Sequence, residues 1–401
     1  MKIVPHKGVT APEGFKAAGI SCGIKSGGKK DLALVYSEIP AVTVAAFTDN
    51  RVVAAPVTVS AENLKGEARA VIINSGNANA CTGPKGLLDA RAMVNLTAAR
   101  LGVEPRHVMV ASTGIIGRPM PMDKVEAGIG VLDLDAGEQA DIDFARAIMT
   151  TDAFPKHLAV EIELSGRPVR IGGAAKGAGM IAPRLVPHAT MIAVVTTDAP
   201  MKKRDLHGHM TAALAKSFNA VTVDGDTSTN DTVFMLANGM AGDFKLSSPD
   251  KRVFQEALDY VCVQLAKMIV RDGEGATKLI EYKVVGAKKD ADALKVAKTV
   301  ANSILVKTAF FGQDPNWGRI LAAAGRAGVA LDPDDLDLDI NGVPVVRSGQ
   351  AADQDASRAA AEMKVEEIQV WINLNQGSCQ AVFYGSDLSY EYVKINAEYS
   401  T

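Results

Sequence analysis

The chain has 401 residues, of which 47% are hydrophobic and 22% charged, and its formal net charge is −3. This length allows one large or two ordinary domains with a sizeable core. The small net charge gives no reason to expect nucleic acid or an acidic membrane surface as a partner.

Cysteine spacing and hydropathy point to a cytoplasmic protein. The four cysteines lack CxxC spacing, so we expect reduced thiols and neither a disulfide framework nor a metal site. The first ten residues contain no apolar run long enough for a signal peptide. No run of about 18 uncharged apolar residues occurs, so we expect no membrane span.

The first glycine-rich segment, "GIKSGGKK" from Gly23, comes close to the P-loop pattern G-x-x-x-x-G-K-[ST]. Lys30 stands where the pattern needs a hydroxyl. The following "DLALVYS" predicts a strand, whereas a P-loop must open a helix whose N-terminus holds phosphate. We therefore interpret this segment as a plain turn between strands.

Further strands and helices follow along the chain. Phe254, Leu258, Val261, Leu265 and Met268 recur at helical spacing after Ser248-Pro249, which predicts a helix that starts at this pair. A second helix is expected over 291–303, and alternating runs around 375–378 predict a hairpin. Three short buried strands are also predicted, of which the first two enter glycine turns: "AVIINSG" (70–76), "HVMVASTG" (107–114) and "MIAVVTTDA" (191–199). The mixture indicates the α/β or α+β class.

Two polar features carry weaker signals. "DGDTSTND" from Asp224 suggests a calcium loop, but Thr229 and Met235 occupy the positions that need glycine and a bidentate glutamate. It is a polar turn that caps backbone groups or a segment that supports an active site. The six histidines form no HExxH cluster, and His188 fits a solvated loop better than a catalytic base.

The segment "KGAGMIAPRLVPHATMIAVVTTDA" places Thr190 between a glycine loop and an apolar strand. A threonine hydroxyl becomes an effective nucleophile when its own α-amine is the base, which requires cutting the preceding bond. That amine has a reference pKa of about 7.7–8.0. The small Ala189 before Thr190 leaves room for the hydroxyl to attack the Ala189 carbonyl. Taken alone, a threonine at such a junction is more often structural.

A series of motifs in order identifies the chain as a member of the ornithine acetyltransferase (glutamate N-acetyltransferase) family. The motifs cover almost the whole chain: "KGAGMIAP" with "ATMIAVVTTDA", "NSGNANACTG", "ASTGIIG", "IMTTDAFPK", "SFNAVTVDGDTSTND", "RDGEGATK", "GQDPNWGRILAAAG" and "YEYVKINAEYST". One departure is "RLVPH" between Pro183 and Ala189, where family members usually have a shorter segment. The resemblance implies that the precursor cuts itself between Ala189 and Thr190.

The resemblance also implies roles for single residues. Thr190 would be both the self-processing residue and the acetyl-accepting nucleophile. Thr113 and Gly114 match the oxyanion hole, which a hydroxyl and a backbone N–H suit chemically. The substrate-binding residues would be Thr150, Lys176, Thr190, Glu274, Asn396 and Thr401. An acidic group suits the ornithine ammonium, and Lys176 suits a carboxylate.

The expected fold is α/β, a sandwich of central β-sheets covered by helices, similar to the self-processing L-aminopeptidase and ornithine acetyltransferase fold. The α chain (1–189) and the β chain (190–401) would form one intertwined catalytic unit in an α2β2 heterotetramer. The resemblance implies acetyl transfer from N2-acetylornithine to glutamate by a ping-pong mechanism, with no cofactor and no metal. Three alternatives remain: an enzyme that also uses acetyl-CoA, a self-processing aminopeptidase, and a non-catalytic anion-binding protein.

Overall fold

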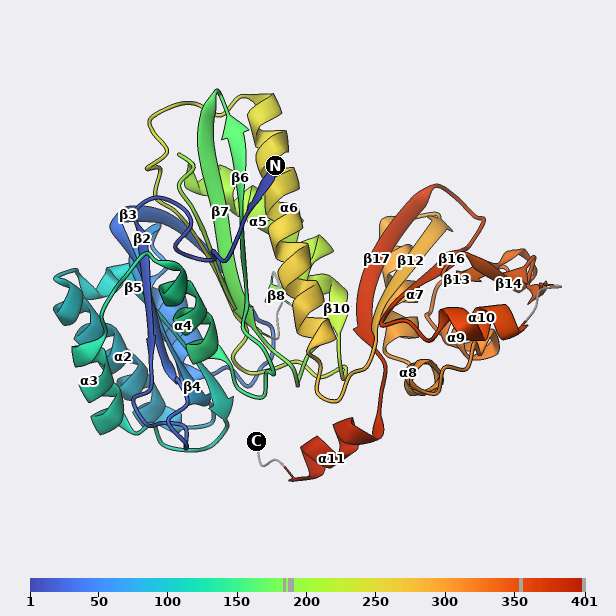
Figure 1. The fold of residues 1–401 in the computed structure, drawn as a ribbon, viewed down its shortest axis with the longest axis horizontal. Helices are drawn as coiled ribbons and strands as arrows, with labels where there is room; N and C mark the ends of the chain where they lie inside the picture. The colour runs from blue at the N-terminus through green and yellow to red at the C-terminus, as the bar shows by residue number, and fades with distance from the viewer. Residues whose placement is uncertain (183–184, 187–190, 353–355, 399–401) are drawn as a thin grey trace. The chain divides into compact units, whose positions relative to one another are not determined.

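The computed structural model forms two compact units (Figure 1). Unit 1 comprises residues 1–219 and 226–269, and unit 2 comprises residues 220–225 and 270–400. Within them the structure describes residues 1–182, 185–186, 191–352 and 356–398. Each unit has its own sheet and helices, so each is described by itself.

Unit 1 is built on a ten-stranded sheet in the order β1-β6-β7-β9-β11-β3-β4-β5, with β2 and β8 also paired to β3. The strands are β1 (Lys2–Val4), β2 (Phe15–Ile20), β3 (Leu32–Thr48), β4 (Glu67–Asn77), β5 (Val108–Ile115), β6 (Lys156–Leu164), β7 (Arg167–Lys176), β8 (Leu185–Val186), β9 (Ile192–Thr197) and β11 (Thr232–Ala237). Strands β9 and β11 are buried at every position. Their near-continuous apolar sequences fit strands covered on both faces.

Helices cover both faces of this sheet (Figure 1). They are α1 (Ala55–Asn63), α2 (Gly83–Leu101), α3 (Met122–Val131), α4 (Glu138–Ile148), α5 (Lys203–Lys216) and α6 (Ser248–Arg271), with the 3-10 helices η1 (Pro105–His107) and η2 (Phe218–Ala220). Helices α2 and α3 pack against Ile72 and Val110, whereas α4 packs against the alternate residues Ile73 and Ala111. Since side chains alternate along a strand, the two helix groups lie on opposite faces of β4 and β5.

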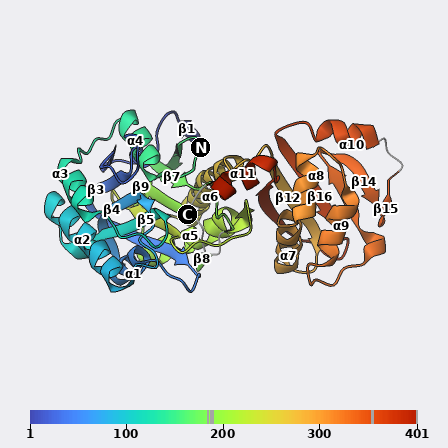
Figure 2. The same cartoon turned by 90° about the horizontal axis from the view of Figure 1, so that it is seen from below.

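Unit 2 has a seven-stranded sheet in the order β10-β17-β12-β16-β13-β14-β15. Its strands are β10 (Val221–Thr222), β12 (Leu279–Ala287), β13 (Asp337–Ile340), β14 (Val343–Arg347), β15 (Gln350–Ala351), β16 (Glu367–Asn373) and β17 (Cys379–Ser386). Its helices are α7 (Asp290–Ala301), α8 (Ile304–Phe311), α9 (Trp317–Gly325), η3 (Pro333–Asp335), α10 (Ala356–Glu362) and α11 (Tyr390–Glu398) (Figure 2). Tyr282 of β12 and Phe310 of α8 meet edge to face in its core.

The hairpin predicted around 375–378 is wrong. Both strands exist as β16 and β17, but β12 lies between them and pairs with each. The connection therefore crosses the end of one strand, where the N–H groups of Leu374 and Gln376 donate to the carbonyls of Val285 and Gly286. Alternating sequence indicates that two segments are strands, but a distant third strand that inserts between them leaves no local signal.

The other expected elements are confirmed. The helix that starts at Ser248 is α6, with four of the five periodic residues buried and Met268 half-buried. Helix α7 (Asp290–Ala301) starts one residue before the predicted segment 291–303 and lies otherwise inside it. The three predicted short strands are β4, β5 and β9. Two sheets with covering helices confirm the α/β class. Among the described residues, no helix combines the length and apolar character needed to span a membrane.

Candidate active site

Two predicted oxyanion residues lie where β4 and β5 end side by side. These strands are parallel, with Ser75 opposite Thr113 and Gly76 opposite Gly114. Gly114 has a φ of +132°, and a Cβ there would come within 2.4 Å of the Gly76 carbonyl carbon. Only glycine therefore fits this position, which explains why the buried strand enters a glycine turn.

Lys176, the last residue of β7, joins two other predicted residues. Its ammonium donates to Thr150 Oγ1 at 2.7 Å and to Thr113 Oγ1 at 3.2 Å. An ammonium group only donates, so both threonine oxygens accept and each hydroxyl hydrogen can still donate to another group. The structure thus brings Thr113, Thr150 and Lys176 into one polar cluster beside Gly114.

Asp152 organises this cluster, although it was not among the predicted site residues. Its side chain is fully buried and pairs with the buried Lys156 ammonium at 2.7 Å. One carboxylate oxygen accepts the N–H of Gly177 at 2.7 Å, and the other accepts the N–H of Thr150 at 2.8 Å. Its place in "TTDAFPK", four residues before Lys156, was the only available sequence signal.

The charges around Asp152 keep it ionised. Burial by itself raises the pKa of this carboxyl, but the nearby charges of Lys176 and Lys156, with the hydrogen bonds from Lys156 and Gly177, outweigh burial. The pKa of Asp152 therefore lies far below its usual range. The negative charge here holds the backbone of Gly177, the residue after Lys176, and that of Thr150, which accepts the Lys176 ammonium.

The segment "TSTN" (227–230) braces the same region. The Thr227 hydroxyl donates to the carbonyl of Ala182 at 3.0 Å. The buried Asn230 amide donates to the carbonyls of Ala78 at 2.6 Å and Ser112 at 2.8 Å. The interpretation as a polar segment that caps backbone groups is confirmed, and a role in supporting an active site stays a prediction.

A second group of predicted residues lies in unit 2. The Asn396 amide of α11 donates to Glu274 Oε2 at 2.9 Å. Gly275 has a φ of +68°, and a Cβ there would come within 2.5 Å of the Tyr392 backbone nitrogen. The Ser389 hydroxyl also donates to the carbonyl of Gly275 at 2.5 Å. This close approach holds Glu274 and Asn396 together.

A buried carboxylate also anchors the Glu274 loop. Asp387 accepts the N–H of Thr277 at 2.8 Å, the Thr277 hydroxyl at 2.6 Å and the N–H of Lys278 at 3.0 Å.

The predicted residues that the structure describes form two groups, one in each unit. Ala189, Thr190 and Thr401 lie outside the described residues, as does His188. The roles assigned to all of these residues stay predictions.

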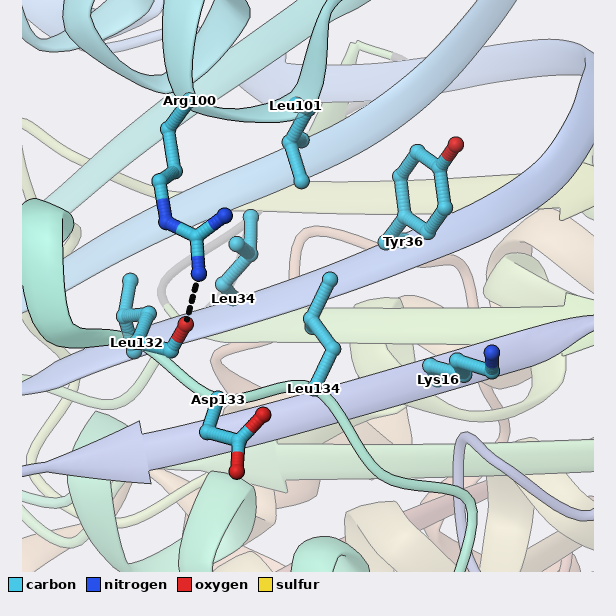
Figure 3. A pocket seen from close by; sticks show the side chains of 8 residues that line it. All are labelled: Lys16, Leu34, Tyr36, Arg100, Leu101, Leu132, Asp133 and Leu134. Atoms are coloured by element: carbon cyan, nitrogen blue, oxygen red, sulfur yellow. Dashed lines mark hydrogen bonds between the residues drawn. The ribbon is translucent and has the colours of Figure 1, made fainter.

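Unit 1 also has a surface hollow. It has a volume of about 190 Å³ and is lined by Lys16, Leu34, Tyr36, Arg100, Leu101, Leu132, Asp133 and Leu134 (Figure 3). Arg100 donates to the carbonyl of Leu132 at 3.1 Å across one side. None of its lining residues was predicted to act in the site, and we assign it no substrate.

The described residues contain no cluster of three or more His, Cys, Asp or Glu suited to a metal ion.

Comparison with known proteins decides the family. Residues 16–401 match the model of the ArgJ family. The chain belongs to the ArgJ family. It is 48% identical to the arginine biosynthesis bifunctional protein ArgJ of Symbiobacterium thermophilum, over 98% of each chain. It is 47% identical, again over 98% of each chain, to the glutamate N-acetyltransferase of Methanocaldococcus jannaschii.

One solved structure is similar over part of the chain. The ornithine acetyltransferase of Mycobacterium tuberculosis, solved in complex with ornithine, is 44% identical with a TM-score of 0.44. It covers 46% of this chain and 99% of its own. The full-length match to the ArgJ family confirms the family identified from the motifs and the predicted class of enzyme, an acyltransferase.

Replacing Asp152 with asparagine should destabilise unit 1. Asp152→Asn leaves the buried Lys156 charge without its partner, so we expect the free energy of unfolding at pH 7 to fall by about 3–5 kcal/mol. Because the folded-state pKa is depressed, the wild-type advantage should persist from pH 8 to 5 and shrink below about pH 4. Urea unfolding of both proteins across this range measures it.

The partly exposed pair of Lys251 and Asp205, also 2.7 Å apart, is the matched control for this prediction. Asp205→Asn should cost less than about 1 kcal/mol, because water already screens that pair. Equal losses for the two variants would contradict the organising role of Asp152.

Proposed function

We propose that this enzyme transfers the acetyl group of N2-acetylornithine to glutamate, giving ornithine and N-acetylglutamate. The observation that carries the proposal is the bonding of Lys176 to both Thr113 and Thr150 beside Gly114. It combines a cation suited to a carboxylate with hydroxyl and N–H donors suited to a developing oxyanion. Relatives named for glutamate N-acetylation and arginine biosynthesis support the choice of substrates.

Self-cleavage would create the nucleophile. The Thr190 hydroxyl attacks the carbonyl of Ala189, the peptide bond becomes an ester, and water hydrolyses that ester. The products are an α chain (1–189) and a β chain (190–401), and the freed α-amine of Thr190 serves as the base. We propose that both chains contribute to one catalytic unit, assembled as an α2β2 heterotetramer in the cytoplasm.

The transfer itself would take two half-reactions. The Thr190 hydroxyl attacks the acetyl carbonyl of N2-acetylornithine, its proton passes to the α-amine, and ornithine leaves with that proton. The amino group of glutamate then attacks the acetyl ester and releases Thr190. Thr113 and the N–H of Gly114 stabilise the oxyanion in both steps. Glu274 with Asn396 suits the ornithine ammonium, and Thr401 and Thr150 complete the proposed set of substrate-binding residues.

Acetyl-CoA is the alternative donor. The relative from Symbiobacterium is named a bifunctional protein and that from Methanocaldococcus a glutamate N-acetyltransferase, at almost equal identity to this chain. Transfer from N2-acetylornithine needs no cofactor because the energy of one amide is retained in the ester and then in the other amide. Incubating processed enzyme with glutamate and acetyl-CoA alone would detect the second activity as N-acetylglutamate.

Thr190→Ala should give a single, uncut and inactive chain, because no hydroxyl can attack the Ala189 carbonyl. Thr190→Ser keeps a hydroxyl and should still be cut, more slowly. A denaturing gel shows the processing, and chromatography of ornithine and N-acetylglutamate shows the transfer. Cleavage of the alanine variant at the same bond would mean that an external protease makes the cut.

Thr113→Val should lower turnover of processed enzyme by about 10²–10³-fold, because valine keeps the shape of threonine without its hydroxyl. The KM values should change much less, since Lys176 keeps its bond to Thr150. Thr113→Ser, which retains the hydroxyl, is the control and should stay within about tenfold of wild type. Unchanged turnover in the fully processed valine variant would remove Thr113 from the oxyanion hole.

A further inference from the structure

The loop between β2 and β3 brings a second lysine to the Lys176 cluster. The ammonium of Lys25 donates to the carbonyl of Met149 at 2.7 Å. The next residue, Thr150, accepts the ammonium of Lys176, also at 2.7 Å. The two lysines therefore bind adjacent residues of one loop, although they come from the sequence segments "GIKSGGKK" and "KGAGMIAP".

The backbone of the Lys25 loop is fixed by a buried carboxylate. Asp31 accepts the N–H groups of Cys22 at 2.7 Å, Gly23 at 3.1 Å and Lys25 at 2.9 Å. The carbonyl of Asp31 in turn accepts the N–H of Ser75 in β4 at 2.9 Å. These bonds hold the loop against the strand that pairs with Thr113, so the position of Lys25 is built into the fold.

The stem of Lys25 passes over a glycine beside the proposed oxyanion donors. A Cβ on Gly76 would come within 2.8 Å of Lys25 Cγ. Gly76 lies directly opposite Gly114 in the paired strands. The absent side chain at Gly76 thus lets the lysine reach the end of β5.

Among the described residues, three ammonium groups and two carboxylates meet in this cluster. Lys25, Lys156 and Lys176 face Asp31 and Asp152, and both carboxylates are already engaged, Asp31 by backbone N–H groups and Asp152 by Lys156. Two neighbouring ammonium groups repel each other in a half-buried place, and an anion that contacts both relieves this repulsion. The chemistry at this point therefore favours a carboxylate ligand.

We propose that Lys25 acts with Lys176 to bind the α-carboxylate of the amino-acid substrate, which is common to N2-acetylornithine and glutamate. The inference rests on the proposed function and adds a second binding cation to it. In both substrates the reacting nitrogen and the α-carboxylate share one carbon atom, so the carboxylate must lie next to the oxyanion donors. Lys176 contacts Thr113 directly, and Lys25 lies over the glycine opposite Gly114.

The first experiment replaces Lys25 in processed enzyme. Lys25→Met should raise the KM for N2-acetylornithine and for glutamate by about 10- to 100-fold, the loss expected for one charge-assisted hydrogen bond. Turnover should fall much less, and Lys25→Arg should restore most of the affinity. Lys29→Met removes the same charge from an exposed position of the same loop, and it should leave both KM values within about twofold of wild type.

A substrate probe separates contact with the carboxylate from a structural effect. N2-acetylornithine α-amide lacks the negative charge, so wild type should use it with a much higher KM than the acid. In Lys25→Met this preference for the acid should shrink by about the same 10- to 100-fold. An unchanged preference would overturn the inference, because Lys25 would then not contact the carboxylate.

The pH dependence gives an independent test that needs only a conservative variant. Burial lowers the pKa of Lys25 to about 8, with Lys176 and Lys29 lowering it further while Asp31 and Asp152 oppose them. Wild-type KM should therefore rise above pH 8 as Lys25 loses its charge. Lys25→Arg stays charged, so this rise should be weaker in that variant. The α-amine of Thr190 titrates in both proteins and cancels in the comparison.

The possible failures are distinguishable. Wild-type enzyme that is processed but transfers no acetyl group from N2-acetylornithine contradicts the proposed function and this inference together. Active wild type with an equal alkaline rise in Lys25→Arg, or with unchanged KM values in Lys25→Met, contradicts the role of Lys25 alone.

Discussion

The buried carboxylate of Asp152 is the interaction on which the arrangement of unit 1 depends. It binds the start of β6 through Lys156, the loop after α4 through Thr150, and the glycine loop after β7 through Gly177. A buried charge is tolerated only when it is paired and hydrogen-bonded, so these three segments are stable together and unstable apart. Lys176 stands between two of these anchors, and its bonds to Thr113 and Thr150 follow from that position.

The charges of the predicted residues differ between the two units. Unit 1 gathers lysines around the buried Asp152, and ammonium groups suit a carboxylate ligand. Unit 2 presents Glu274 and Asn396, held together by the approach of Gly275 to α11, and a carboxylate there suits an ammonium group. Amino-acid substrates of the ornithine type carry both charges, so two groups of opposite character agree with the proposed substrates.

The sequence was most informative where local signals act alone. Helical spacing predicted α6 and α7, and apolar runs before glycine turns predicted β4 and β5. At the end of β5 only glycine fits position 114. It failed where distant segments meet, because β12 separates the two strands of the expected hairpin. Motifs predicted Thr113, Thr150 and Lys176, which the structure brings into contact. They did not predict Asp152, because its partners are mostly backbone groups. They did not predict Lys25 either, because the segment that holds it was rejected as a P-loop and matched no other motif.

In the proposed mechanism, Thr190 carries the acetyl group between the two substrates. The most direct measurement is to mix processed enzyme with N2-acetylornithine in the absence of glutamate, quench in acid at short times, and determine the mass of the β chain. We expect a burst of ornithine and a β chain heavier by one acetyl group on the peptide that begins at Thr190, and this group should be cleared when glutamate is added. Ornithine formation only in the presence of glutamate, with no acetylated β chain at any time, would contradict it and require direct transfer between the two bound substrates.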